Sequence, residues 1–213
     1  MVLTPDLEHL IEQRVEQRLE QRVQAQVIEL VELLAIRPIT EDIALRVEAI
    51  EGFKHLEIVA GEWVGLGKDD PFMGGEKHGW IESILIHLLM TWALATKAGR
   101  VYGGDTMFVL DGEPGDIRLK RQPDVAFMAA DRIQPPDLAV EIISPSERPD
   151  DIQKKLREYL QQGVRMVWQV YPESREIVVH LPDSTARTYR LGEVISGGDV
   201  LPGLELSVTE VFA

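Results

Sequence analysis

The chain has 213 residues, 45% of them hydrophobic, and a formal net charge of −14. This length accommodates one sizeable hydrophobic core with an appendage and is short for two full domains. Because there is no cysteine, disulfides and thiolate metal sites are excluded, and we expect a cytoplasmic protein. The acidic charge gives no general attraction to nucleic-acid phosphates, so any binding of DNA has to depend on a local basic surface or on metal.

The longest apolar run, Ile84 to Ala95, is well short of the roughly 20 residues that a membrane span needs. We therefore predict a buried helix here and no membrane partner. His87 interrupts this run, and we interpret it as a core histidine. Trp80, Trp92 and Trp168 also lie in apolar patterns and are predicted to belong to the core.

The segment from Thr4 to Ile36 is predicted to be one long helix. Thr4, Pro5 and Asp6 provide a capping hydroxyl, a first-turn proline and an acid near the positive end of the helix dipole. A tandem repeat of one apolar residue followed by Glu-Gln-Arg begins at Ile11, and it places like charges four residues apart, where they repel along a lone helix. We therefore expect a partner surface to supply the opposite charges. Residues 1–50 are interpreted as a helical extension that forms a homodimer, and packing against its own domain is the alternative.

Residues 51–213 are predicted to form one α/β domain. Strand-like and helix-like segments alternate along this part of the chain, which indicates a mixed sheet flanked by helices. The predicted helices are Glu41 to Ile50, His78 to Ala98 and Asp151 to Gln162, and a loop is predicted from Gly67 to Lys77. The predicted strands are two within His55 to Leu66, then Arg100 to Leu110, Arg118 to Ala129, Asp137 to Ile143, Val164 to Val170, Glu176 to Leu181 and Arg187 to Leu191.

Glu141 lies in the middle of the most apolar predicted strand, Asp137 to Ile143. Burial of an unpaired carboxylate costs several kcal/mol, so such a residue is normally paired, protonated or bound to metal. Asp124 precedes the neighbouring apolar segment, and two carboxylates with a backbone carbonyl form the kind of oxygen site that Mg²⁺ or Mn²⁺ prefers. The alternative is that Glu141 pairs with a buried Arg or Lys for structural reasons.

The helix that follows this strand carries Asp151, Lys155 and Tyr159 four residues apart, which places them on one face. A short loop connects strand and helix, so this face can return over the end of the strand. A lysine there could orient or deprotonate a water, or offset charge on a phosphate.

Several ordered motifs in this chain together resemble the Uma2 family, also called DUF820, a family of restriction-type endonucleases abundant in cyanobacteria. The resemblance extends from about Leu56 to the C-terminus and leaves the N-terminal helix outside. It is carried by the segments Glu57–Glu62, His78–Gly79, Arg121–Phe127, Pro136–Ser146, Asp151–Tyr159, Gly163–Val170 and Leu201–Leu206.

This resemblance implies a restriction-endonuclease-like fold of the PD-(D/E)xK type. It implies that Asp124, Glu141 and the carbonyl of Ile142 bind the metal. Since Ile143 occupies the position of the usual motif lysine, Lys155 on the next helix is implied as its replacement. A further acid is expected from an early element. The candidates are Glu57, Glu62, Glu76 and Glu82, of which Glu62 is preferred.

The expected function is Mg²⁺-dependent hydrolysis of DNA phosphodiester bonds, with Mn²⁺ as a possible substitute. A second hypothesis is a catalytically inactive nuclease-fold module that binds nucleic acid or protein, which the acidic charge favours. A third is a structural oligomer in which Glu141 and Lys155 form a buried ion pair. His78, which matches the family, is interpreted as a residue that starts a helix, and a role in the site is the alternative.

Overall fold

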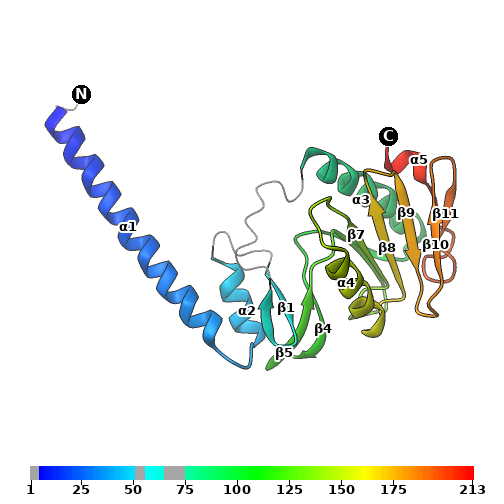
Figure 1. Ribbon diagram of the computed structural model, residues 1–213, viewed down its shortest axis with the longest axis horizontal. Coiled ribbons are helices and arrows are strands. Elements are labelled where there is room, and N and C mark those ends of the chain that lie inside the picture. The colour runs from blue at the N-terminus through cyan, green and yellow to red at the C-terminus, as the bar shows by residue number, and fades with distance from the viewer. Residues whose placement is uncertain (1–4, 51–55, 65–74) are drawn as a thin grey trace.

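The computed structural model describes residues 5–50, 56–64 and 75–213, and the side chains from residue 14 onward within these ranges. The predicted capping residue Thr4 and most of the predicted loop from Gly67 to Lys77 lie outside the described residues. The elements that remain form a mixed α/β fold with a long helix at its N-terminal end (Figure 1).

The largest sheet has six strands in the order β10-β9-β8-β7-β6-β3. The pair β7 and β8 is parallel and the other pairs are antiparallel, which confirms the predicted mixed sheet. Its strands are β3 (Gly99–Gly103), β6 (Val125–Ala129), β7 (Leu138–Ile142), β8 (Met166–Tyr171), β9 (Glu176–His180) and β10 (Ala186–Tyr189).

Helices cover both faces of this sheet (Figure 1). Because side chains alternate along a strand, Leu138, Val140 and Ile142 of β7 point to the face covered by α3 (Glu76–Thr96). Ala139 points to the opposite face, where Leu156 and Tyr159 of α4 (Pro149–Gln161) pack. Glu141 therefore belongs to the α4 side. At the far edge lie β11 (Val194–Ser196), β12 (Glu205–Ser207) and α5 (Val208–Val211).

A second sheet of four strands has the order β2-β1-β5-β4. Its strands are β1 (Glu57–Val59), β2 (Glu62–Val64), β4 (Phe108–Glu113) and β5 (Asp116–Arg121). One hydrophobic cluster joins this sheet to α2 (Glu41–Glu48) and to the C-terminal end of α1 (Pro5–Ala35); its buried members include Leu33, Val47 and Ile58. The small sheet and α2 thus pack as one unit.

Two predicted strands are each divided in the structure. The segment predicted from Arg100 to Leu110 forms β3 and β4, which belong to different sheets, and Gly103 and Gly104 lie where they separate. The segment predicted from Arg118 to Ala129 forms β5 and β6. Pro123 lies between them, and since proline has no N–H to donate to a ladder, pairing ends there.

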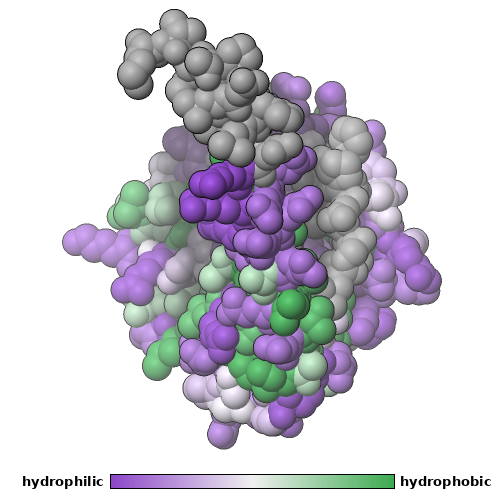
Figure 2. Space-filling view, turned by 90° about the vertical axis from the view of Figure 1, so that its left-hand side faces the viewer, coloured by the Kyte–Doolittle hydropathy of each residue, from purple (hydrophilic) through white to green (hydrophobic). Residues whose placement is uncertain are grey.

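Most of α1 stands away from the rest of the molecule (Figure 1). Every residue from Arg14 to Glu29 is exposed, and burial begins at Leu30. Figure 2, drawn from the side on which α1 projects, shows hydrophilic and hydrophobic surface next to each other on that face.

The buried face of α3 differs from the prediction for two residues. Ile81, Leu85, Leu89, Trp92 and Ala93 face the sheet, and Trp168 is also buried as predicted. Trp80 is 55% exposed, with its Nε1 donating to the carbonyl of Ala213 at 3.0 Å, and His87 is exposed. Both core predictions are wrong because apolar residues surround this helix and do not mark one buried side. By length and composition alone α3 also matches a membrane span, a test that the core helix of a globular protein can pass as well.

Candidate active site

Glu141 lies in β7 and is only 7% exposed. Its Oε1 accepts a hydrogen bond from the Tyr159 hydroxyl at 2.6 Å, and its Oε2 accepts one from Lys155 Nζ at 3.0 Å. Burial raises the pKa of Glu141 to about 7, and the negative charges of Asp124 and Glu57 act in the same direction, although Lys155 opposes them. The carboxyl group is therefore held where its charged form is unfavourable unless more positive charge is close.

Lys155 and Tyr159 reach Glu141 because they lie one turn apart on the face of α4 that covers the sheet. The pKa of Lys155 is raised chiefly by the charge of Glu141, so its side chain stays protonated. A second acid, Glu147 in the loop before α4, has its Oε1 3.8 Å from Lys155 Nζ. The predicted placement of this helix face over β7 is what the structure shows.

Asp124 immediately precedes β6 and reaches across to β7, where its Oδ2 accepts a hydrogen bond from the backbone N–H of Ile142 at 2.6 Å. This contact places Asp124 next to Glu141. Its Oδ1 is 3.2 Å from Nε2 of His78, near the N-terminal end of α3. The hydrogen bond with Asp124 raises the pKa of His78, which burial lowers to a smaller extent. His78 thus contacts the site and is more than a residue that starts a helix.

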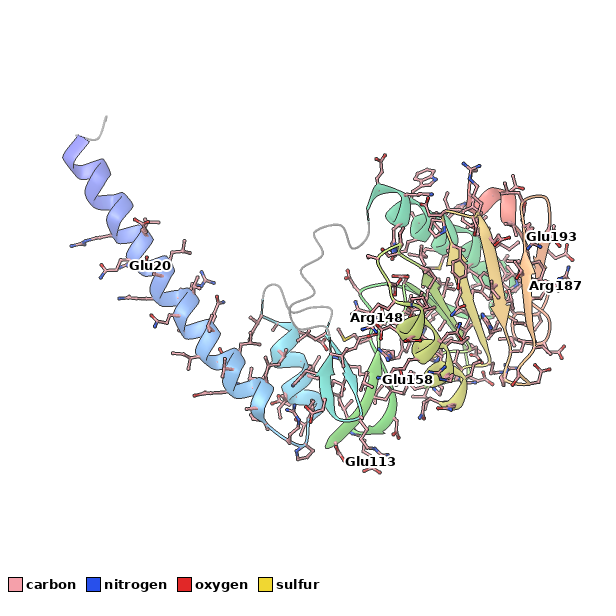
Figure 3. All side chains as sticks on the ribbon, viewed as in Figure 1. Glu20, Glu113, Arg148, Glu158, Arg187 and Glu193 are labelled. Atoms are coloured by element: carbon pink, nitrogen blue, oxygen red, sulfur yellow. The ribbon has the colours of Figure 1, made fainter. Side chains whose placement is uncertain are left out.

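A buried arginine links the small sheet to this site. Arg121 of β5 is 3% exposed and forms ion pairs with Glu57 of β1 and Glu158 of α4. Its Nε donates to Glu158 at 2.9 Å, and Figure 3 shows Glu158 on α4 near the small sheet. Glu57 also accepts a hydrogen bond from the backbone N–H of Gln122 at 3.4 Å. The network fixes α4, and with it Lys155, against the strand that leads to Asp124.

The structure does not bring Glu62 to these residues. Glu62 lies in β2, its side chain is 69% exposed, and it pairs with Arg37 at 2.5 Å. This pairing lowers the pKa of Glu62. Among the other early acids, Glu76 is exposed at the start of α3, and Glu82 accepts a hydrogen bond from the N–H of Gly104 at 3.1 Å. Glu57 is the early acid whose charge acts on Glu141.

We expect Glu57→Gln to lower the activity of the site by roughly tenfold or more, because partners that orient a site's carboxylates typically contribute that much. Glu62→Gln should leave the activity unchanged, since Glu62 faces solvent beside Arg37. Measuring the initial rates of both variants at equal protein concentration tests the distinction. A lower rate for Glu62→Gln with an unchanged rate for Glu57→Gln would indicate that Glu62 belongs to the site and would contradict the role of Glu57.

The Uma2 family model, described as "Putative restriction endonuclease", matches residues 54–209. The chain belongs to the Uma2 family. All of the site residues above lie within the matched range, whereas α1 and α2 lie outside it.

A solved structure supports the fold. The crystal structure described as that of "a putative nuclease belonging to DUF820" from Anabaena variabilis matches with a TM-score of 0.63 at 20% sequence identity. The match covers 82% of this chain and 98% of the other. A comparison with curated proteins gives no match. At this identity the similarity establishes the nuclease-type fold.

In this Uma2 protein, the candidate metal site has few side-chain oxygen donors. Within residues 14–50, 56–64 and 75–213, no group of three or more His, Asp or Glu side chains is arranged to hold an ion. Mg²⁺, however, usually keeps several waters and is bound by one or two carboxylates together with substrate phosphates. Asp124 and Glu141 supply such a pair, and the negative charge of Asp124 helps to raise the pKa of Glu141. The donor set fits that ion.

Three contributors to the site could not be assigned from the sequence. Arg121 forms ion pairs with two acids that are distant from it in the sequence. No sequence pattern marks Glu158 as different from the other charged residues of α4. Gln169 lies opposite Glu141 in the parallel pairing of β7 with β8 and is 3% exposed. A polar residue inside the apolar run of β8 is the one signal that could have indicated Gln169.

Proposed function

We propose that this Uma2 protein is a Mg²⁺-dependent endonuclease that hydrolyses DNA phosphodiester bonds. One observation carries the proposal: Glu141 is a buried carboxylate whose pKa is raised to about 7 by burial and by the acids Asp124 and Glu57, with Lys155 as its one cationic hydrogen-bond partner among the described residues. Such an excess of negative charge favours a divalent cation. Membership in a family of restriction endonucleases and a nuclease-type fold support the same chemistry.

Asp124, Glu141 and the backbone carbonyl of Ile142 are the groups that would hold Mg²⁺, with Mn²⁺ as an alternative ion. When bound, such an ion lowers the pKa of a coordinated water and offsets charge on the phosphate. The same carboxylates are held by the Ile142 N–H, Tyr159 and Lys155, so their positions are fixed in advance. This fixed arrangement reduces the reorganisation that the reaction requires.

Lys155 acts as a donor and not as a base. Because the charge of Glu141 raises its pKa, its ammonium group stays protonated at neutral pH. It can donate a hydrogen bond to the attacking water or to a phosphate oxygen and offset the negative charge that develops there. Among the roles open from the sequence, the proposal therefore assigns Lys155 that of a hydrogen-bond donor and not that of a base.

We expect Lys155→Ala to lower the cleavage rate by about 100- to 1,000-fold, the usual effect of removing one donor from a preorganised site. Lys154→Ala is a matched control, because Lys154 is the neighbouring lysine of α4 and is exposed to solvent. Single-turnover rates of the two variants give the comparison. Equal cleavage rates for Lys155→Ala and Lys154→Ala would show that Lys155 does not contribute to the reaction.

The proposed function is tested by incubating the purified chain with supercoiled plasmid in Mg²⁺, in Mn²⁺ and in EDTA. Cleavage in the two metals and none in EDTA is the expected result. Binding of DNA without cleavage under every condition would favour the inactive nuclease-fold module, which the net charge of −14 makes the second candidate. Cleavage that persists in EDTA would contradict the metal site.

We further propose that residues 51–213 act as the nuclease domain and residues 1–50 as a helical extension, in a cytoplasmic homodimer formed through α1. The exposed apolar side chains of α1 support this proposal, since Val15 and Leu19 are each 60% exposed and Val23 is 51% exposed. A run of such residues on one helix is typical of a surface that another chain covers.

A further inference from the structure

The exposed part of α1 carries an apolar stripe that nothing else in the described chain covers. Val15 and Leu19 are each 60% exposed and Val23 is 51% exposed. At the other end of the helix Leu30 and Leu33 are buried with α2, so the chain's own packing ends there. The family model begins at residue 54, so the stripe is an addition to the nuclease domain.

The charged residues beside the stripe cannot neutralise one another within the helix. Residues three or four apart are neighbours on a helix surface, whereas residues two apart are not. Glu16 and Glu20 are four apart, as are Arg18 and Arg22, but each of these glutamates is separated from these arginines by two or by six residues. The repeat therefore leaves like charges adjacent and needs a second surface for pairing.

These charges form two flanks of opposite sign. With about 100° between successive residues, Glu16 and Glu20 lie about 60° and 100° to one side of Leu19. Arg22 and Arg18 lie at about the same two angles on the other side. The stripe thus has an acidic border and a basic border, and Figure 3 shows Glu20 on the part of α1 that projects from the molecule.

The symmetry of a dimer decides which borders meet. When two identical helices pair in parallel about a two-fold axis along their length, the acidic border of each faces the basic border of the other. When they pair antiparallel, acidic meets acidic and basic meets basic, which repels. We infer that α1 binds α1 of a second copy in parallel and in register through Val15, Leu19 and Val23. Glu20 then lies only about 3 Å along the axis from Arg18 and Arg22 of the other helix.

The contact is short because the stripe winds around the helix. A repeat of four residues advances by about 40° per step on a helix of 3.6 residues per turn. Val27 and Val31 have therefore turned away from the side that Leu19 presents. Val15, Leu19 and Val23 form the contact between the two helices. The apolar side chains that follow on nearly the same side, Leu30 and Leu33, are covered by α2.

The parallel arrangement has a consequence that depends on the proposed nuclease function. Both chains leave their paired helices at the same end, so both nuclease domains lie there together. In an antiparallel pair the domains would lie at opposite ends of a helix of 31 residues, about 46 Å long. The parallel dimer thus suits two sites that act on the two strands of one duplex.

Two single-cysteine variants test the orientation in the full chain, which has no native cysteine. In a parallel, in-register dimer, Val15→Cys and Val23→Cys should each form a disulfide-linked dimer on mild oxidation, because each residue faces its own copy. In an antiparallel dimer at most one of the two variants can form a disulfide with its own copy. If the antiparallel helices cross at Leu19, residue 15 lies opposite residue 23, and only a mixture of the two variants forms linked dimers. A disulfide-linked dimer from only one of the two variants, or only from their mixture, overturns the inference. The absence of any linked dimer overturns it as well. The readout needs no DNA cleavage, so it stands apart from the nuclease proposal.

The oligomeric state of two further variants tests the stripe itself. Leu19→Asp places a charge in the centre of the contact, and light scattering should report half the mass of the wild-type dimer. Gln17→Asp, exposed and about 160° away on the helix, is the matched control and should keep the dimer. A monomeric wild-type chain, or equal masses for the two variants, would overturn the inference.

Discussion

Glu141→Gln is expected to reduce metal-dependent DNA cleavage by on the order of a thousandfold while the fold is retained. The amide has nearly the shape of the carboxyl group and can still accept the Tyr159 hydrogen bond, but it carries no charge to hold a divalent cation. Loss of about 4 kcal/mol of transition-state stabilisation, a modest share for a metal site, corresponds to that factor. Single-turnover rates in Mg²⁺ measure the effect.

The matched control for this variant is Glu205→Gln. Glu205 is also a strand glutamate, in β12, but it is exposed and lies outside the site, so its rate should be that of the wild-type chain. Asp124→Asn should behave as Glu141→Gln does, because Asp124 is the second carboxylate of the pair. Metal-dependent DNA cleavage by the Glu141→Gln protein at the wild-type rate would contradict the assignment of the metal site.

Thermal unfolding separates the nuclease from a purely structural ion pair. The contact of Lys155 with Glu141 at 3.0 Å is what both readings require, so geometry alone does not distinguish them. A ligand that binds the folded state raises its stability, and a Mg²⁺ site should therefore raise the melting temperature of the wild-type chain. Glu141→Gln should abolish this shift. No shift in the wild-type chain would favour the ion pair.

The sequence predicted the contacts at the centre of the candidate site because the relevant signals are local. A glutamate inside a continuous apolar strand is unusual enough to mark Glu141, and four-residue spacing places Lys155 and Tyr159 on one face of the next helix. The strand and the helix are neighbours in the chain, so a short connection brings them together. The structure confirms this contact and the mixed sheet that supports it.

The parts that the sequence did not predict depend on long-range pairing. Glu57 and Glu62 are both acids of short strands joined by one turn, and nothing local tells which of them turns toward β7. Glu57 is held at the site by its ion pair with Arg121, and the sequence gives no local signal of this pair because the two residues are 64 positions apart. Likewise, one predicted strand became β5 and β6 in different sheets, because the two sheets separate at Pro123.

The stability of the protein in EDTA should depend on pH through Glu141. Burial raises the pKa of Glu141 from 4.5 to about 7 in the folded chain. A carboxyl group whose pKa is raised on folding contributes stability that is fully present below about pH 4.5. This stability is lost as the pH rises through about 7, because the folded state then gives up a proton that it holds more tightly than the unfolded state does. The free energy of unfolding should fall by about 3 kcal/mol from this group across that window.

Glu141→Gln removes this titrating group and nearly keeps its shape, although Lys155 then also loses the rise in pKa that the charge of Glu141 causes. In EDTA the two chains should be similarly stable near pH 4.5, and the variant should be the more stable by about 3 kcal/mol at pH 8. Urea unfolding at a series of pH values measures the difference. Added Mg²⁺ should narrow it by stabilising only the wild-type chain, because the ion binds the charged carboxylate. Parallel pH curves for the two chains in EDTA would show that Glu141 ionises as freely in the folded state as in the unfolded state, which its burial against Tyr159 and Lys155 argues against.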